Sequence, residues 1–272
     1  MITLMQSGVC KKPKNAIAED VVGYAGKYYW LLDGATPITG GQCILQQFLR
    51  YLNAGLNQYA ISALNPQMLL YQAMHFAKKQ LDKENLLVGI KHKPRCTGIV
   101  IKVEEENVEY SVLGDSTLCF IDNVDNTCFS ITNNRLANFA VEERERMESC
   151  KFDSDEYIKA RDVVIETEDK YFNKPDGFWF VSVNPEAAYM GINGFYDFKQ
   201  DTTILLMSDG LTRFVEVFQC YQNYDGIATL IRVKGASYVF SQLRNLEVNR
   251  QDIKRPSLHD DASFMMLDIK KI

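Results

Sequence analysis

Aspartates at the ends of strand-like runs are the residues of this sequence best suited to chemistry. Asp33 and Asp209 each follow an apolar run, Asp260 lies just before one, and Asp115 ends a fourth run of the same kind. A carboxylate at a strand end is held by a rigid sheet and still faces solvent. Several such groups on neighbouring strands repel one another unless a cation neutralises them.

A cluster of this kind predicts a metal centre. Hard divalent ions such as Mg²⁺ and Mn²⁺ take oxygen ligands and retain water, and two of them side by side can activate water against a phosphate ester. We therefore predict that Asp33, Asp209 and Asp260 hold two Mg²⁺ or Mn²⁺ ions. The prediction requires that three side chains far apart along the chain meet in one acidic pocket.

An alternative explanation exists for two of these positions. Asp33-Gly34 and Asp209-Gly210 are dipeptides that also mark ordinary tight turns. Taken singly, each one favours a hairpin turn over a metal ligand. The aspartates taken together, in their order along the chain, favour the metal site.

The strands and helices predicted to hold these aspartates occur in separate groups along the chain. Period-two patterns and β-branched residues predict strands over 2–9, 20–24, 28–32, 97–103, 108–113, 117–121, 178–183, 203–207 and 262–269. Apolar residues at three- and four-residue spacings, or helical composition, predict helices over 41–59, 66–81, 135–170, 211–217 and 224–245. Grouped elements favour an α+β fold with two antiparallel sheets and outer helices over a doubly wound parallel sheet.

Composition narrows the class of protein. The 272 residues are 46% hydrophobic and 24% charged, as expected for a globular chain. A net charge of −5 argues against a nucleic-acid partner, and no run of apolar residues is long enough for a membrane span. Seven cysteines without a Cys-x-x-Cys pair argue against a disulfide framework or a structural zinc site. With no signal peptide recognised, we expect a cytoplasmic location.

Six short motifs follow one another in a defined order. They are Ala18-Glu19-Asp20, Trp30-Leu31-Leu32-Asp33-Gly34-Ala35, Cys96-Thr97-Gly98, Leu113-Gly114-Asp115-Ser116, Met207-Ser208-Asp209-Gly210-Leu211 and Asp260-Asp261-Ala262-Ser263. No single motif is specific, but the ordered set resembles the metal-dependent protein phosphatases, the PPM or type 2C serine/threonine phosphatases. The resemblance spans nearly the whole chain.

The resemblance implies a fold and a reaction. It implies one domain over residues 1–272, built as a four-layer α-β-β-α sandwich of two central antiparallel sheets flanked by helix pairs. A flap or insertion is expected around 150–200, where it could select the substrate. The implied activity is hydrolysis of phosphoserine or phosphothreonine in a phosphorylated protein by a hydroxide that bridges two divalent metals.

The resemblance also implies roles for the acidic residues. Asp33 is similar to the ligand that bridges both metals, and the Gly34 carbonyl to a ligand of the second metal. Asp209 and Asp260 are similar to ligands of the first metal. Asp20, with its neighbour Glu19, matches an acidic pair that acts largely through water. Asp115 and Ser116 match a motif that we interpret as mainly a structural turn.

Three positions depart from the family pattern. Asn15 stands where many members place an arginine that binds the substrate phosphate, so Lys14, or else Lys12, is the candidate phosphate-binding residue. Lysine supplies a point charge without the bidentate fork of arginine. Ala35-Thr36 stands where some members have a histidine, which leaves protonation of the leaving group to water.

The position of a third metal ligand in bacterial relatives aligns with Asn133 or Asn134, which argues against a third metal site. Of the three histidines, only His259 adjoins a predicted ligand, and a purely structural place is its favoured interpretation. The departures keep two alternatives open: a catalytically weak phosphatase-fold module that binds or regulates, and a phosphatase of a small phosphorylated molecule. The sequence leaves the oligomeric state undetermined.

Overall fold

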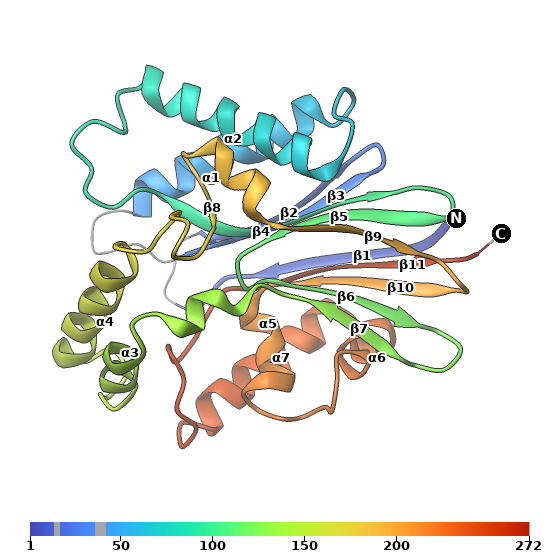
Figure 1. Cartoon of the computed structure of the whole chain (residues 1–272). Coiled ribbons are helices and arrows are strands. Elements are labelled where there is room, and N and C mark those ends of the chain that lie inside the picture. The colour runs from blue at the N-terminus through green and yellow to red at the C-terminus, as the bar shows by residue number, and fades with distance from the viewer. Residues whose placement is uncertain (14–16, 36–41, 272) are drawn as a thin grey trace.

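Two antiparallel sheets lie face to face in the computed structural model, which describes residues 1–13, 17–35 and 42–271 (Figure 1). The first sheet has the order β1-β11-β10-β6-β7, and the second has the order β2-β3-β4-β5-β9. The strands of the first are β1 (Ile2–Cys10), β11 (Ala262–Ile269), β10 (Thr202–Met207), β6 (Thr117–Asp122) and β7 (Cys128–Ile131). Those of the second are β2 (Asp20–Ala25), β3 (Tyr28–Gly34), β4 (Arg95–Val103), β5 (Asn107–Leu113) and β9 (Ile192–Asp197), with β8 (Val181–Ser182) paired to β4.

Strand β10 shows how the sheets are buried on both sides. Every residue of β10 is buried, although successive side chains of a strand point to opposite faces. Ile204 and Leu206 pack in the core between the sheets, whereas Leu205 and Met207 pack against the helices beneath. A strand covered on both faces reads as a continuous apolar run, which is the pattern seen before Asp209.

Helices α1 (Gln42–Tyr59) and α2 (Pro66–Lys83) cover the outer face of the second sheet (Figure 1). Phe48, Leu52 and Leu56 on α1 are fully buried at the spacing of one helix face. Trp30 of β3 lies in the same core, and its indole N–H donates to Asn53 Oδ1 at 2.9 Å. The buried ring is therefore also satisfied as a hydrogen-bond donor.

Three helices cover the outer face of the first sheet: α5 (Asp209–Glu216), α6 (Asp225–Lys234) and α7 (Ala236–Asn249). Gly235, with φ of 78°, separates α6 from α7. Because this left-handed conformation favours glycine, the stretch predicted as mainly helical over 224–245 becomes two helices.

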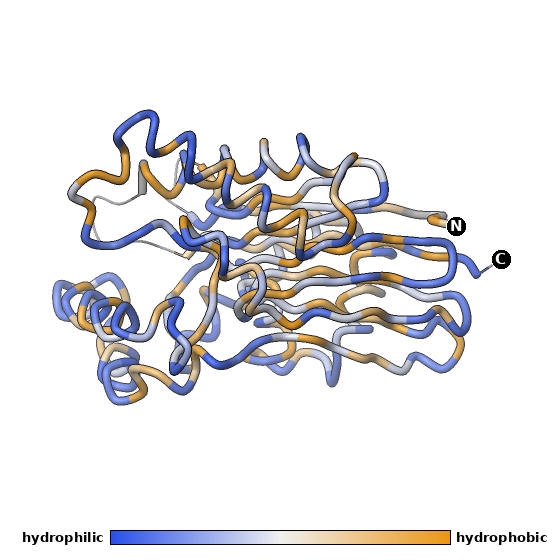
Figure 2. The backbone as a smooth tube through the Cα atoms, turned by 45° about the horizontal axis from the view of Figure 1, so that its top comes forward, coloured by the Kyte–Doolittle hydropathy of each residue, from blue (hydrophilic) through white to orange (hydrophobic). Residues whose placement is uncertain are grey.

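A smaller helix pair, α3 (Val141–Glu148) and α4 (Asp155–Glu168), lies at the end of the sandwich away from the chain termini (Figure 1). The short helices η1 (Asn134–Asn138) and η2 (Pro185–Met190) flank the segment that contains it. Hydrophobic colour runs along the strands in Figure 2, and hydrophilic colour dominates α3 and α4. This pair has its own small apolar cluster around Met147 and Tyr157.

The predicted α+β sandwich with two antiparallel sheets and outer helices is confirmed. Two details of the sequence analysis are wrong. The strand expected over 178–183 is reduced to β8, and β7 and β9, which form edges of the two sheets, were not expected. Edge strands bury only part of one face, so their apolar pattern is weak.

One pair of cysteines is joined, although the spacing of the seven cysteines argued against a disulfide framework. Cys119 on β6 and Cys128 on β7 are joined, with their Cα atoms 6.6 Å apart. The antiparallel pairing of β6 with β7 brings these positions together. Since β7 was not predicted, the sequence offered no reason to pair them.

No helix within the described residues is long and apolar enough to cross a membrane.

The start of α2 offers a test of local stability. Asn65 Oδ1 accepts the Met68 N–H at 2.8 Å, and Pro66 occupies the first helical turn. We expect Asn65→Ala to lower the free energy of unfolding by about 1 kcal/mol, because it removes the N-cap acceptor. Chemical denaturation measures the change. Asn65→Asp keeps the acceptor and serves as the control; equal losses in both variants would contradict the capping role.

Candidate metal centre

Asp33 and Asp20 lie opposite each other at one end of the second sheet. The β2–β3 register pairs Asp20 with Asp33, and the β3–β4 register pairs Asp33 with Thr97. Gly34 continues β3, and its N–H donates to the Glu19 carbonyl at 3.1 Å. A side chain at position 34 would put its Cβ 2.5 Å from that carbonyl oxygen, so the close approach requires glycine. Asp33-Gly34 is thus the end of a strand and not a turn.

Asp209 follows a strand of the first sheet and lies beside Asp33. It is the first residue of α5, directly after β10, and its N–H lies 3.4 Å from Asp33 Oδ2. Gly210 lets the chain of Asp261 pass, since a Cβ there would lie 1.8 Å from the Asp261 carbonyl oxygen. Asp209-Gly210 therefore begins a helix, and the contact of Asp209 with Asp33 links the first sheet to the second. The requirement that Asp33 and Asp209 meet is fulfilled.

Asp260 and Asp261 precede β11 and join the site from the first sheet. Asp260 Oδ2 accepts from Arg213 Nη2 at 2.7 Å, and its side chain is 27% exposed. Asp261 is buried, and its carboxylate accepts the backbone N–H groups of Lys12, at 2.6 Å, and of Glu19. Asp261 thereby fixes the chain that leads into Asp20.

The aspartates are close enough to alter one another's protonation. Burial, with the charges of Asp20, Asp209 and Asp260, raises the pKa of Asp33 well above its usual value. Burial, with the charges of Asp260 and Asp115, raises the pKa of Asp209 to about 8. Burial, with the charges of Asp261 and Asp260, raises the pKa of Asp20 to about 7. The acidic residues that the sequence analysis selected thus form one cluster.

Asp115 belongs to this cluster as well as to a turn. Its carboxylate contributes to the raised pKa values of Asp33 and Asp209, and burial raises its own pKa to about 6. Gly114, with φ of 80°, and the buried hydroxyl pair of Thr97 and Ser116 support the turn. The interpretation of Asp115 as mainly structural was therefore incomplete.

The donor set fits a hard divalent cation. Both carboxylate oxygens of Asp20 are buried and have no hydrogen-bond partner among the residues that the structure describes, which is costly unless a proton or a cation compensates them. The neighbouring donors are carboxylates and the Gly34 carbonyl, which are oxygen ligands of the kind that Mg²⁺ and Mn²⁺ take. Across residues 1–13, 17–35 and 42–271, no three acidic, histidine or cysteine side chains are already gathered in a geometry that would hold a metal ion.

Lys12 supplies a positive charge at the edge of the cluster. Its ammonium lies 2.9 Å from Glu19 Oε2, and its side chain is 15% exposed. Burial opposes its charge, but Asp260, Glu19 and Asp261 outweigh that effect and raise the pKa of the ammonium. Of the other residues singled out near the site, Lys14, Asn15 and Thr36 lie outside the described residues.

Arg213 contacts the predicted ligand Asp260 directly and was not expected from the sequence. Arg213 lies one helical turn after Asp209 on α5 and forms the ion pair with Asp260 described above. The four-residue spacing was visible, because positions i and i+4 share a helix face. That this face meets the chain before β11 was not visible in the sequence.

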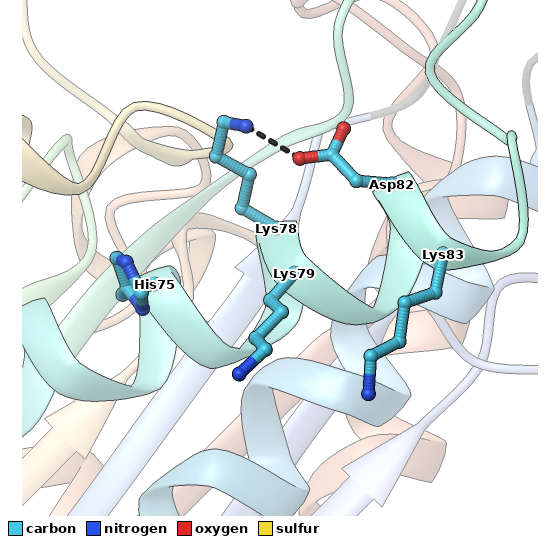
Figure 3. A pocket seen from close by; sticks show the side chains of 5 residues that line it. All are labelled: His75, Lys78, Lys79, Asp82 and Lys83. Atoms are coloured by element: carbon cyan, nitrogen blue, oxygen red, sulfur yellow. Dashed lines mark hydrogen bonds and ion pairs between the residues drawn. The ribbon is translucent and has the colours of Figure 1, made fainter.

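A hollow of about 470 Å³ lies on α2, apart from the carboxylates. His75, Lys78, Lys79, Asp82 and Lys83 line it, all from one helix (Figure 3). Lys78 Nζ pairs with Asp82 at 2.5 Å, as expected for residues four apart on an exposed helix. None of the residues that the sequence analysis assigned to the site is among them.

Comparison with known proteins gives matches to solved structures only. No protein-family model and no curated protein matches the chain by sequence. The PPM Ser/Thr phosphatase MsPP from Mycobacterium smegmatis, in complex with cacodylate, is 17% identical with a TM-score of 0.56, over 98% of this chain and 99% of that one. The catalytic domain of the phosphatase PstP, in complex with two manganese ions, is 14% identical with a TM-score of 0.55, over 98% of each chain.

The photosystem II phosphatase PBCP is 13% identical with a TM-score of 0.61, and the match covers 99% of each chain. The similarity thus extends along nearly the whole of each solved chain, although the sequences have diverged widely. It agrees with the four-layer arrangement of sheets and helices. The chain has the fold of the PPM serine/threonine phosphatases, and the sequence-based prediction of that fold is confirmed.

Proposed function

We propose that this protein is a divalent-metal-dependent phosphatase that hydrolyses phosphoserine or phosphothreonine in proteins. The observation that carries the proposal is the convergence of Asp20, Asp33, Asp115, Asp209 and Asp260 at one end of a PPM-type sandwich. A crowded set of carboxylates with raised pKa values is the electrostatic environment that a divalent cation stabilises. Crowding these carboxylates costs stability in the metal-free protein, and a bound cation would offset that cost.

Each residue of the site has its own proposed role. Asp33 would contact two Mg²⁺ or Mn²⁺ ions, with the Gly34 carbonyl on one of them and Asp209 and Asp260 on the other. When bound, these ions would supply Lewis-acid activation of water and neutralise charge on the phosphoryl group. Asp20, buried behind Asp33, would accept hydrogen bonds from water at the site.

Lys12 is the residue we propose for holding the substrate phosphate. Glu19 and Asp261 hold its side chain and backbone beside the acidic cluster, and the same acidic groups keep the ammonium charged. A single lysine gives attraction without the two-point geometry of arginine. We therefore expect phosphate binding that is weaker and more sensitive to salt than an arginine would provide.

A second candidate is a binding or regulatory module with weak turnover. Arg213 occupies one oxygen of Asp260, and asparagine stands at position 15 where an arginine is expected. Calorimetry with Mn²⁺ and turnover of a phosphopeptide separate the two candidates. Tight metal binding without turnover favours the module, whereas metal-dependent turnover favours the enzyme.

Asp33→Asn tests the metal centre directly. We expect metal-dependent hydrolysis of an aryl phosphate to fall roughly 1000-fold or more, because charge stabilisation by the metals is worth several kcal/mol. Asp122→Asn, at the far end of β6, is the matched control and should leave turnover unchanged. Undiminished turnover in Asp33→Asn would reject the assignment.

Lys12→Gln tests the phosphate contact. We expect kcat/KM for a phosphopeptide to fall roughly 10- to 100-fold, mainly through KM, because a charged hydrogen bond to the substrate is lost. Lys12→Arg keeps the charge and should retain activity. Steady-state kinetics at constant ionic strength measure both variants, and an unchanged KM in Lys12→Gln would exclude this role.

The pH dependence of stability tests the carboxylate cluster. The pKa of Asp209 rises from 3.8 to about 8 and that of Asp20 to about 7, so the metal-free folded form holds protons that the unfolded form releases. The stability from this proton binding is present below the unfolded pKa and is lost as pH rises through the folded values. We expect the Tm of the metal-free protein to fall between roughly pH 5 and pH 8.

Excess Mn²⁺ should raise Tm most at the upper end of this pH range, because metal and protons compete for the same oxygens. Differential scanning calorimetry with and without chelator measures the effect. An equal rise in Tm on adding Mn²⁺ at about pH 5 and at about pH 8 would contradict the competition between metal and protons.

A further inference from the structure

A buried carboxylate lies behind Asp260. Glu247 on α7 is fully buried, and cationic or ionisable groups contact both of its oxygens. Oε1 lies 3.3 Å from Arg213 Nη1, while Oε2 lies 2.6 Å from Arg244 Nη1 and 2.7 Å from His259 Nδ1. A buried carboxylate is tolerated when it is paired and hydrogen-bonded on all sides, as Glu247 is.

Arg213 connects this carboxylate to Asp260. Its Nη2 donates to Asp260 Oδ2 at 2.7 Å and to Ser257 Oγ at 2.9 Å, and its side chain is only 5% exposed. The planar fork of arginine allows one side chain to contact Glu247 and Asp260 together. Since Arg213 follows Asp209 by one turn, α5 carries one proposed metal ligand and holds a second.

Arg244 holds the main chain of the same residue. Its Nη2 donates to the Asp260 carbonyl at 2.7 Å and to the Cys10 carbonyl at 3.1 Å, which ties the chain before β11 to the end of β1. The side chain and the backbone of Asp260 are therefore each held by an arginine. Glu247 forms ion pairs with both arginines, and the Asp260 carboxylate forms a second ion pair with Arg213.

We infer that Arg213 and Glu247 are positioning residues that fix the Asp260 carboxylate for metal binding. The inference rests on the proposed function, because it takes Asp260 as a ligand. Arg213 and Ser257 contact Oδ2, whereas Oδ1 accepts the Asp261 N–H at 3.1 Å and has no cationic partner among the described residues, so Oδ1 is the oxygen that we assign to the cation. Groups that hold a metal ligand from behind commonly change metal affinity when they are removed.

Positioning and simple charge predict opposite results, which makes the inference testable. Arg213 is a positive charge beside a site for cations, so by Coulomb's law its removal should tighten Mn²⁺ binding. If Arg213 positions Asp260, its removal should weaken Mn²⁺ binding even though a repelling charge is gone. Glu247 keeps Arg244 and His259 as partners in Arg213→Met, so it is not left unpaired.

The experiment is a Mn²⁺ titration of the full chain, with free Mn²⁺ counted by electron paramagnetic resonance. We expect Arg213→Met to raise the Kd for Mn²⁺ roughly 10-fold or more. Arg232→Met is the matched control, because it removes an ion pair of 2.8 Å with Asp268 at the other end of β11. The control should leave the Kd unchanged, and circular dichroism confirms that each variant is folded.

Arg213→Lys keeps the charge but loses the fork, and it decides the question if Arg213→Met does not fold. Weaker Mn²⁺ binding by Arg213→Lys supports positioning. Unchanged or tighter binding in the Arg213 variants, with normal binding by the parent protein, overturns this inference and leaves the proposed function standing. Absence of Mn²⁺ binding by the parent protein overturns the metal centre itself, and this inference with it.

Discussion

Repulsion among closely spaced carboxylates is the main physical constraint on this structure. The charges of Asp20 and Asp209 raise the pKa of Asp33, and both oxygens of Asp20 lack a hydrogen-bond partner among residues 1–13, 17–35 and 42–271. A fold gains nothing in stability from such an arrangement. It is maintained because extensive apolar packing elsewhere outweighs it, between the sheets and beneath both helix layers.

The two sheets contribute to the cluster in different ways. The second sheet presents Asp20 and Asp33 side by side through a strand register, which is rigid and local. The first sheet presents Asp209 at the start of a helix and Asp260 before a strand. Gly34 lets β3 approach the Glu19 carbonyl on the side of the second sheet, and Gly210 lets α5 approach the Asp261 carbonyl on the side of the first. The site is therefore a property of the interface between sheets and belongs to neither alone.

Arginines balance the acidic groups at the periphery of the cluster. Arg213 and Arg244 surround Glu247 behind Asp260, and Arg95 and Arg144 both contact Glu168 of the α3–α4 pair. Glu247 and Glu168 thus each have two arginine partners, and their desolvation is offset by charged hydrogen bonds. Within the described part of the chain, no arginine forms an ion pair with Asp20, Asp33 or Asp209, and this is where we propose that the cations bind.

The fold class, the main strands and helices, and the aspartates that we propose as metal ligands could be predicted from the sequence. These predictions follow from local rules: apolar periods of two and of about 3.6, and aspartates adjoining apolar runs. Each depends on neighbours along the chain, so each is visible in one dimension.

Contacts between distant parts of the chain could be seen only in the three-dimensional structure. They depend on strand pairing and on the junction of the two sheets. Examples are the ion pair of Arg213 with Asp260, the contact of Lys12 with Glu19, the disulfide of Cys119 with Cys128, and the place of Asp115 in the cluster. The physical reason is that side-chain contacts and electrostatic interactions act through space. Residues 176 positions apart, as Asp33 and Asp209 are, carry no local signal that they will touch.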